Sequence, residues 1–167
     1  GSNGTVLKTS DGGVSWDAIS INNIWFSSIY FVNDSIGWLA GDYGLLYKTT
    51  NGGDSWSKKN SSTSNTIHSI SAPSESNVWI AGRFNSIFGS FNGGEEWIQI
   101  FSESNILNQI QFQNENIGWC AGYNGKIFKS TDGGDNWVSK SNGTNMYHNS
   151  ITFTSDAVGF LVANNGI

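Results

Sequence analysis

The residues of this chain that have the chemistry for catalysis are few and lie far apart in the sequence. Hydrolysis of a glycosidic bond requires two carboxyl groups at a fixed separation, one acting as an acid and one as a base or nucleophile. The acidic residues outside the repeated motif that could serve are Asp42, Glu75, Glu103, Glu115 and Asp156. They do not recur in a common arrangement, so we interpret them as solvated loop charges and predict that the chain is not an enzyme.

The histidines and the cysteine do not form a metal-binding pattern. His68 and His148 are not spaced as zinc ligands with a cysteine or a carboxylate pair. Cys120 stands where three segments of similar sequence place an aliphatic residue, namely Leu39, Ile80 and Leu161. We therefore predict a buried, unreactive thiol, no metal site and no cofactor.

The charge of the chain argues against two classes of partner. It has 8 basic and 13 acidic residues and a formal net charge of -5, and Arg83 is its one arginine. Binding to nucleic acid needs a cluster of basic residues to displace counterions from phosphates. No apolar run approaches the roughly 18–20 residues of a membrane span. We predict no nucleic-acid partner and no membrane insertion.

An eight-residue motif that occurs four times is the dominant pattern of the chain. The copies are TSDGGVSW at 9–16, TTNGGDSW at 49–56, SFNGGEEW at 90–97 and STDGGDNW at 130–137. The final tryptophans are spaced by 40, 41 and 40 residues. Periods of this length are typical of propellers and solenoids, in which each unit buries its apolar face against a neighbour.

The motif itself has the composition of a structural turn. Its third position holds Asp or Asn, which accepts hydrogen bonds from backbone amides ahead of it; these residues are Asp11, Asn51, Asn92 and Asp132. Two glycines follow, and the motif ends in an aromatic ring large enough to anchor the turn by burial. We predict equivalent, largely buried positions for Trp16, Trp56, Trp97 and Trp137.

Each repeat contains four short strand patterns. In the second repeat they are the alternating apolar residues at 29–31, the segment 36–41, the segment 45–49 that leads into the motif, and the segment from 56 to 59. The sequence therefore predicts an all-β fold, a β-propeller with four-stranded blades of about 40 residues. Residues 1–167 would form one propeller segment with four blade-equivalents.

The four motifs resemble Asp-box (BNR) repeats, and the resemblance spans the whole chain. The third and fourth copies depart from the pattern at Glu96 and Asn136. The resemblance implies a β-propeller with the motif between the third and fourth strands of each blade. The blades, with Gly-Trp-x-Ala-Gly before the motif, look most like the photosystem II stability/assembly factors and their bacterial relatives. The family also includes sialidases and xyloglucan-cleaving enzymes; sialidase chemistry, by resemblance, needs three arginines.

The chain begins and ends at the same phase of the repeat. Residues 1–4 correspond to 41–44, and residues 163–167 occupy that phase again. In a closed four-bladed ring the two ends would compete for one position. We therefore expect a segment of a larger ring, completed by additional blades or by a second copy of the chain, with a self-closed four-bladed ring as the alternative.

One face of the propeller is the predicted binding surface. It should gather the loops between second and third strands and the loops between blades, because repeated scaffolds carry variable residues there. The candidate binding residues are Asp42, Tyr43, Arg83, Phe84, Tyr123, Asn124, Tyr147 and His148. A second candidate set at the start of the innermost strands is Ser27, His68, Asn108 and Asn149.

These patterns predict a non-catalytic binding or scaffold propeller, extracellular or on a cell surface, that recognises a protein or a glycan. Exposed aromatic rings beside amides and a carboxylate can stack on sugar rings and form hydrogen bonds to their hydroxyl groups. The alternatives are a fragment of a xyloglucanase-like glycoside hydrolase and a protein similar to the photosystem II assembly factors.

Overall fold

The computed structural model describes residues 2–84, 87–102, 106–140, 143–155 and 157–164. Its regular elements are β-strands and two single-turn 3-10 helices, η1 (Ser2–Gly4) and η2 (Asp42–Gly44). Within these residues no helix has the length and apolar character needed to cross a membrane.

Three antiparallel sheets of four strands form the middle of the chain. The first consists of β3 (Phe26–Phe31), β4 (Gly37–Gly41), β5 (Leu45–Thr49) and β6 (Ser57–Asn60). The second consists of β7 (Ile67–Ser71), β8 (Val78–Gly82), β9 (Ile87–Ser90) and β10 (Ile98–Phe101). The third consists of β11 (Leu107–Phe112), β12 (Gly118–Gly122), β13 (Ile127–Ser130) and β14 (Val138–Ser139).

A two-stranded half-sheet lies at each end of the chain. The first pairs β1 (Thr5–Lys8) with β2 (Asp17–Ser20), and the second pairs β15 (Tyr147–Phe153) with β16 (Gly159–Asn164). In every sheet the strands follow chain order, and each Asp-box turn joins a third strand to a fourth. The predicted all-β, four-stranded propeller blades are confirmed.

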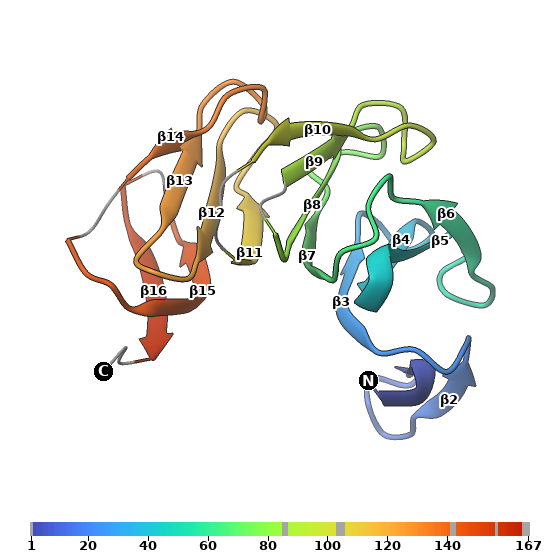
Figure 1. Cartoon of the computed structure of the whole chain (residues 1–167). Coiled ribbons are helices and arrows are strands. Elements are labelled where there is room, and N and C mark those ends of the chain that lie inside the picture. Colours follow the sequence, from blue (N-terminus) through green and yellow to red (C-terminus); the bar gives the residue numbers. More distant parts are fainter. Residues whose placement is uncertain (1, 85–86, 103–105, 141–142, 156, 165–167) are drawn as a thin grey trace.

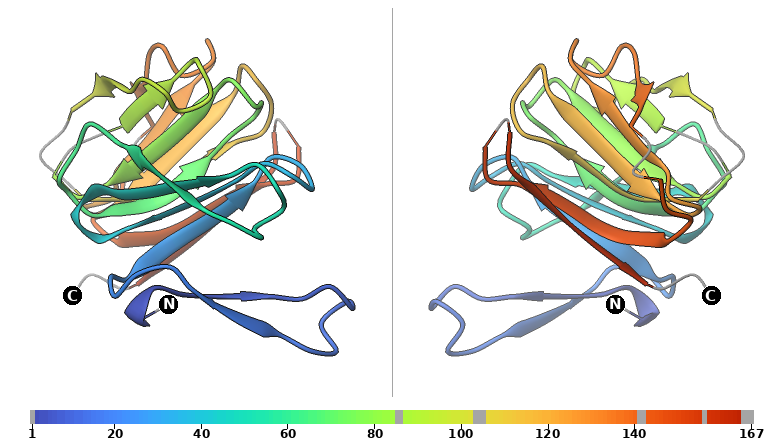
Figure 2. Two further views of the ribbon diagram at one scale, coloured as in Figure 1. Left: turned by 90° about the vertical axis from the view of Figure 1, so that its right-hand side faces the viewer. Right: turned by 90° about the vertical axis from the view of Figure 1, so that its left-hand side faces the viewer.

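The blades are arranged along an open arc rather than a closed ring (Figure 1). The half-sheets occupy the two ends of the arc, and the views turned by 90° show the first hairpin set apart from the body of the sheets (Figure 2). The self-closed four-bladed ring is therefore not the arrangement in this structure.

The core lies between blades, where large side chains of one blade meet the Asp-box of the next. Trp38 on β4 and Trp79 on β8 are fully buried. The ring of Trp38 meets Trp97 edge to face at 6.1 Å, and Trp79 stacks on Phe112 at 5.3 Å. A Cβ on Gly94 would lie 2.0 Å from Trp38, so the second glycine of that box is required by close packing as well as by its φ of +86°.

Hydrogen bonds within each Asp-box hold the turn as predicted. In the second box, Asn51 Oδ1 accepts from the Ser55 amide at 3.0 Å and from the Thr49 hydroxyl at 2.9 Å. The Thr49 hydroxyl oxygen accepts in turn from the Gly53 amide at 2.9 Å. The other three boxes repeat these bonds.

The third and seventh positions of the boxes are matched as acceptor and donor. In the fourth box the Asn136 amide group donates to the Asp132 carboxylate at 2.8 Å. In the third box the roles are reversed, because the Asn92 amide group donates to the Glu96 carboxylate at 3.3 Å. The departures of Glu96 and Asn136 from the repeat pattern are therefore compensated inside each turn.

The carboxylates of the boxes are held in their ionised form. Bonds from the Ser15 hydroxyl, the Ser15 amide and the Thr9 hydroxyl keep the pKa of Asp11 well below its usual range. The backbone and side-chain amides of Asn136 lower the pKa of Asp132 in the same way. A carboxylate in this state does not supply a proton at neutral pH, which agrees with a structural role.

The prediction of four equivalent buried tryptophans is wrong for the first box. Trp97 and Trp137 are buried and Trp56 is half-buried, whereas Trp16 is 57 % exposed. Trp137 packs edge to face on Phe112, a residue of the first strand of its own blade. The sheet that carries Trp16 contains only β1 and β2, so this aromatic partner is missing from it.

Cys120 is fully buried in the core between the second and third blades. Burial raises the pKa of its thiol. The prediction of a small, buried core residue is confirmed.

Candidate functional site

The loops that join second to third strands lie at the same end of the blades as the loops that join one blade to the next. The strand register requires this, since Phe26 at the start of β3 pairs with Gly41 at the end of β4, and Leu45 pairs with Asn60. We call this end the loop face. It contains η2 and the segments around 83–84, 123–125 and 145–147.

Three residues of the loop face share one uncommon backbone conformation. Tyr43, Phe84 and Asn124 occupy equivalent positions on successive blades and have φ values of 57°, 51° and 57°. Asn tolerates this left-handed region, whereas an aromatic residue is strained there by about 1–3 kcal/mol. The rings of Tyr43 and Phe84 are 78 % and 68 % exposed, so packing in a core does not account for them. Strain retained at an exposed position is typical of functional sites.

The turn that carries Tyr43 is braced by its neighbours. The Ser61 hydroxyl donates to the Gly44 carbonyl at 2.6 Å, and the Thr66 hydroxyl donates to Asp42 Oδ1 at 3.1 Å. The Asp42 amide donates to the Trp25 carbonyl at 3.1 Å. Asp42 therefore fixes the loop that presents Tyr43.

A hollow of about 440 Å³ lies beside Tyr43. Its other lining residues are Gly44, Lys58, Lys59, Asn60, Ser61 and Thr63. Lys59 forms an ion pair with Glu95 at 2.5 Å, and Lys58 adds a second basic side chain to the wall. An exposed aromatic ring beside basic side chains suits a ligand that carries both an apolar group and a carboxylate.

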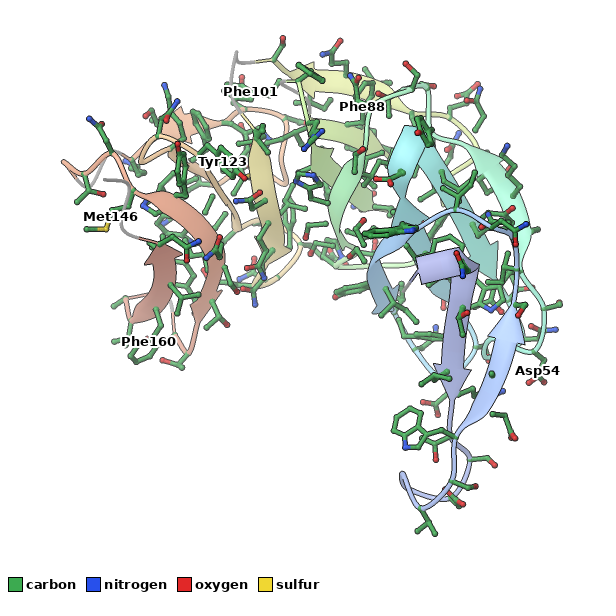
Figure 3. The ribbon with its side chains drawn as sticks, turned by 60° about the horizontal axis from the view of Figure 1, so that its bottom comes forward. Asp54, Phe88, Phe101, Tyr123, Met146 and Phe160 are labelled. Carbon is green, nitrogen blue, oxygen red and sulfur yellow. The ribbon has the colours of Figure 1, made fainter. Side chains whose placement is uncertain are left out.

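The structure brings two other predicted residues together. The rings of Tyr123 and Tyr147 are 4.5 Å apart, although one follows β12 and the other begins β15. The Gly125 amide donates to the Met146 carbonyl at 2.8 Å and ties the two segments. Tyr123 and Met146 lie on the same limb of the arc in Figure 3.

His148 does not belong to the displayed surface. Its side chain is fully buried, and Nδ1 lies 3.2 Å from the Lys126 carbonyl oxygen. The prediction that the loop face displays this histidine is corrected, because the alternation of β15 directs it between blades while Tyr147 before it is 40 % exposed. Arg83 and Asn124 are exposed, as predicted.

The second candidate set connects the blades. The Ser27 hydroxyl donates to the Ile67 carbonyl of the next blade. His68 Nδ1 lies 3.1 Å from the Leu107 carbonyl oxygen, and the Asn108 side-chain amide donates to the His148 carbonyl at 2.7 Å. Each of these three side chains forms a hydrogen bond to a backbone carbonyl of the next blade, and we call these bonds inter-blade clips. Burial lowers the pKa of His68. Asn149, the equivalent residue of the last blade, donates instead to Asn164 on its own strand pair at 2.9 Å.

The candidate carboxylates are not brought together. Glu75 accepts a hydrogen bond from Asn33 at 2.7 Å at the end of the blades opposite to the loop face, and Glu115 stands in the equivalent turn of the next blade. Asp42 lies on the loop face, while Glu103 and Asp156 lie outside the described residues. Among the side chains that the structure describes, no group of three His, Cys, Asp or Glu residues is placed to hold a metal ion.

Sequence reasoning missed three residues of the loop face. Trp25 is 62 % exposed immediately before β3, Met146 is 36 % exposed before β15, and Lys58 lines the hollow beside Tyr43. Trp25 had one available signal, since the equivalent residue of the last blade is Tyr147, an aromatic residue that was itself a candidate. Lys58 had none, because its role depends on its distance from another turn.

Comparison with known proteins identifies the kind of propeller. The sequence model described as "Photosynthesis system II assembly factor YCF48" matches residues 1–63, 19–107 and 98–167. No curated protein matches the chain.

Several solved structures have the same fold. The structure of YCF48 bound to a D1 peptide has a TM-score of 0.63 and 18 % identity, over 86 % of this chain and 63 % of that chain. YCF48 from Cyanidioschyzon merolae has a TM-score of 0.72 and 18 % identity, over 97 % of this chain and 61 % of that chain. The GH74 enzyme of Niastella koreensis has a TM-score of 0.75 and 14 % identity, over 97 % of this chain and 30 % of that chain. The chain spans less than two thirds of each.

Proposed function

Because the chain belongs to the photosynthesis system II assembly factor YCF48 family of BNR-repeat propellers, we propose that it is a non-catalytic assembly or scaffold unit that binds a segment of a partner protein on its loop face. The family match favours this alternative from the sequence over recognition of a glycan at the cell surface. An extracellular location stays a prediction.

The observation that carries the proposal is the pair of exposed aromatic residues in strained conformations, Tyr43 and Phe84. They stand on braced turns of adjacent blades, so an extended peptide lying across those blades meets both rings without a large ordering cost. Aromatic side chains on rigid supports are frequent binding hot spots.

A protein ligand is supported by one of the similar structures, which contains YCF48 with a D1 peptide. The hollow beside Tyr43 offers this chain a place for an acidic side chain or a terminal carboxylate, because Lys58 lines it, while Lys59 in the same wall is already paired with Glu95. The chain has a net charge of -5, so the basic side chain of Lys58 is a local feature that favours a complementary segment.

The absence of catalysis is part of the proposal. The similarity to GH74 enzymes lies at 14–21 % identity and concerns the fold. Glu75 and Glu115 lie at the end of the blades opposite to Asp42, which supports a role without paired acid and base.

The test is a binding measurement with the D1 peptide and a library of acidic peptides, run beside xyloglucan oligosaccharides and a panel of glycosidase substrates. We expect peptide binding without turnover. Tyr43→Ala and Phe84→Ala should each weaken it by about tenfold or more. The matched control is Ile98→Ala, which removes an exposed apolar side chain of β10 outside the loop face. Binding that survives both aromatic changes, or turnover of a glycan, would refute the proposal.

A further inference from the structure

A pair of residues faces across each junction between blades on the loop face. One member directly follows a second strand, and the other lies where the first strand of the next blade begins. At the junction of β3–β6 with β7–β10 the pair is Asp42 and Thr66, and the Thr66 hydroxyl donates to Asp42 Oδ1 at 3.1 Å. At the junction of β11–β14 with β15–β16 it is Tyr123 and Tyr147, whose rings lie 4.5 Å apart. In both pairs the side chains contact each other across two blades.

The pair at the middle junction has no contact of this kind to offer. It consists of Arg83 and Ile106, and an isoleucine side chain has neither a hydrogen-bonding group nor an aromatic ring. The three complete blades share instead a backbone bond, from the amide after the second strand to the carbonyl before the first strand of the same blade. That bond holds each turn on its own blade, whereas the side-chain pair holds it to the next blade.

Thr66 is bonded to both turns that carry the strained aromatic residues. Its hydroxyl donates to Asp42, the residue before Tyr43. Its carbonyl accepts from the amide of Arg83, the residue before Phe84, at 2.9 Å. The acceptor of the first bond is a carboxylate, and hydrogen bonds to a charged group are stronger than bonds between neutral groups. One residue therefore connects the aromatic turn of one blade with that of the next.

Thr66 is placed to act on a ligand through Asp42 rather than by touching it. The residue is half-buried, and the hollow that it lines has a volume of about 10 Å³. A space of that size holds one water molecule at most. The larger hollow beside Tyr43 does not include Thr66 in its wall.

The Tyr43 turn is also braced from its own blade. The Ser61 hydroxyl donates to the Gly44 carbonyl at 2.6 Å, and Ser61 directly follows β6 of that blade. Ser61 and the backbone bond of Asp42 therefore keep the turn on the first complete blade, and the Thr66 bond adds the tie to the second. A strained conformation persists where its surroundings constrain it from several sides.

We propose that Thr66 is a positioning residue for the peptide site. Its hydroxyl fixes the Tyr43 turn against the next blade, so that the rings of Tyr43 and Phe84 meet a ligand at a set spacing. The inference rests on the proposed function, because the site that it adjusts is the loop face. A ligand that contacts both rings binds more tightly when their spacing is already fixed, since less order has to be created on binding.

Hydrogen exchange of the ligand-free chain tests the positioning directly. Thr66→Val removes the hydroxyl and keeps the shape, and Ile106 at the equivalent position of the next blade is already a β-branched apolar residue. The amide of Asp42 should exchange about fivefold faster, because loss of the side-chain bond makes opening of the turn easier. The amide of Arg83 bonds to the Thr66 carbonyl and should keep its rate. Equal exchange of the Asp42 amide in both proteins would overturn the proposal.

Peptide affinity tests whether the positioning matters for binding. With the D1 peptide as the probe, Thr66→Val should weaken binding by about fivefold, and Thr66→Ser, which keeps the hydroxyl, should bind as the wild type does. The matched control is Thr154→Val, which should leave the affinity unchanged. It removes a threonine hydroxyl that donates to the Val158 carbonyl at 3.3 Å, at the end of the blades opposite to the loop face.

A double-mutant cycle separates positioning from a general loss of stability. In the Tyr43→Ala background, Thr66→Val should have little further effect on affinity, because the ring that it positions is gone. Losses that multiply, or a Thr66→Ser variant as weak as Thr66→Val, would contradict the positioning role.

Failure of this inference and failure of the proposed function give different results. If the wild type binds neither the D1 peptide nor any acidic peptide, the proposed function fails, and the exchange rate of the Asp42 amide still decides whether Thr66 holds the turn. If the wild type binds and Thr66→Val binds equally well, the peptide site stands and the positioning role is refuted.

Discussion

Hydrogen-bond complementarity inside the Asp-box turns explains why Asp and Asn both occur at the third position. The carboxylate of Asp132 receives a donor from Asn136, and the amide of Asn92 gives a donor to Glu96. The turn requires one side-chain donor and one side-chain acceptor at these two positions, in either order. In both orders the side-chain oxygen of the third position also accepts from the backbone amide of the seventh.

Exchanging the donor and the acceptor of the fourth box tests whether their pairing stabilises the turn. Asp132→Asn should lower the unfolding midpoint by a few degrees, because two amide groups then compete as donors and a charge-assisted bond is lost. Adding Asn136→Glu should restore most of the lost unfolding temperature, because the double variant copies the pair of Asn92 and Glu96. Thermal denaturation of the two variants checks this, and equal midpoints for both would contradict it.

The strained Tyr43 makes a prediction that separates binding from stability. Tyr43→Asn places in the left-handed conformation the residue type that Asn124 uses at the equivalent position. We expect the free energy of unfolding to rise by about 1 kcal/mol while peptide affinity falls. The reverse change, Asn124→Tyr, is the matched control and should lower stability. Chemical denaturation with peptide titration measures both quantities.

At the scale of the element, blade pairs are joined by two kinds of contact, the side-chain clips of the inner strands and the tryptophan–glycine contacts at the boxes. The His68 clip is the one that titrates. Burial lowers the pKa of His68 below its usual value of 6.5, and Arg83 acts in the same direction while Asp42 opposes it. The neutral form is therefore favoured in the folded chain.

The lowered pKa of His68 sets the direction in which the stability of the fold depends on pH. The unfolded chain binds the proton more readily, so the contribution of His68 is present above about pH 6.5 and is lost as the pH falls through the lower folded pKa. His68→Asn should keep a clip to Leu107, as Asn108 does in the next blade, and should flatten the stability profile between about pH 7 and 5. A profile unchanged from wild type would contradict the assignment.

The glycines of the Asp-boxes differ in how well they tolerate replacement by alanine. Gly94→Ala should destabilise the chain by several kcal/mol, because the new Cβ would meet Trp38 at 2.0 Å. Gly12→Ala is the control: its φ is also positive, but nothing lies within 4 Å, so only about 1 kcal/mol of backbone strain is expected. Urea denaturation compares them.

For the whole molecule, the sequence repeat was enough to predict the architecture. It was not enough to predict the contacts between one repeat and the next. The box bonds join residues two to four positions apart, so Asp11 and Asn51 could be assigned from local sequence. The clip of Ser27 reaches a carbonyl 40 residues later, and the exposure of Trp16 depends on strands that its half-sheet lacks. The loop face was predicted in outline, but the burial of His148 and the hollow beside Tyr43 depend on the packing of separate blades.

The backbone bonds of the loop face have a consequence for engineering. Asp42, Arg83 and Tyr123 each donate their amide to a carbonyl of the inter-blade loop, a bond that does not depend on their side chains. The residue after each one, at positions 43, 84 and 124, can therefore be changed without loss of that backbone bond, within the residue types that tolerate the left-handed conformation of these positions. If the loop face binds a peptide as proposed, a combinatorial library of such residue types at those three positions should change the peptide that is bound while the blades stay the same, and display selection would measure this.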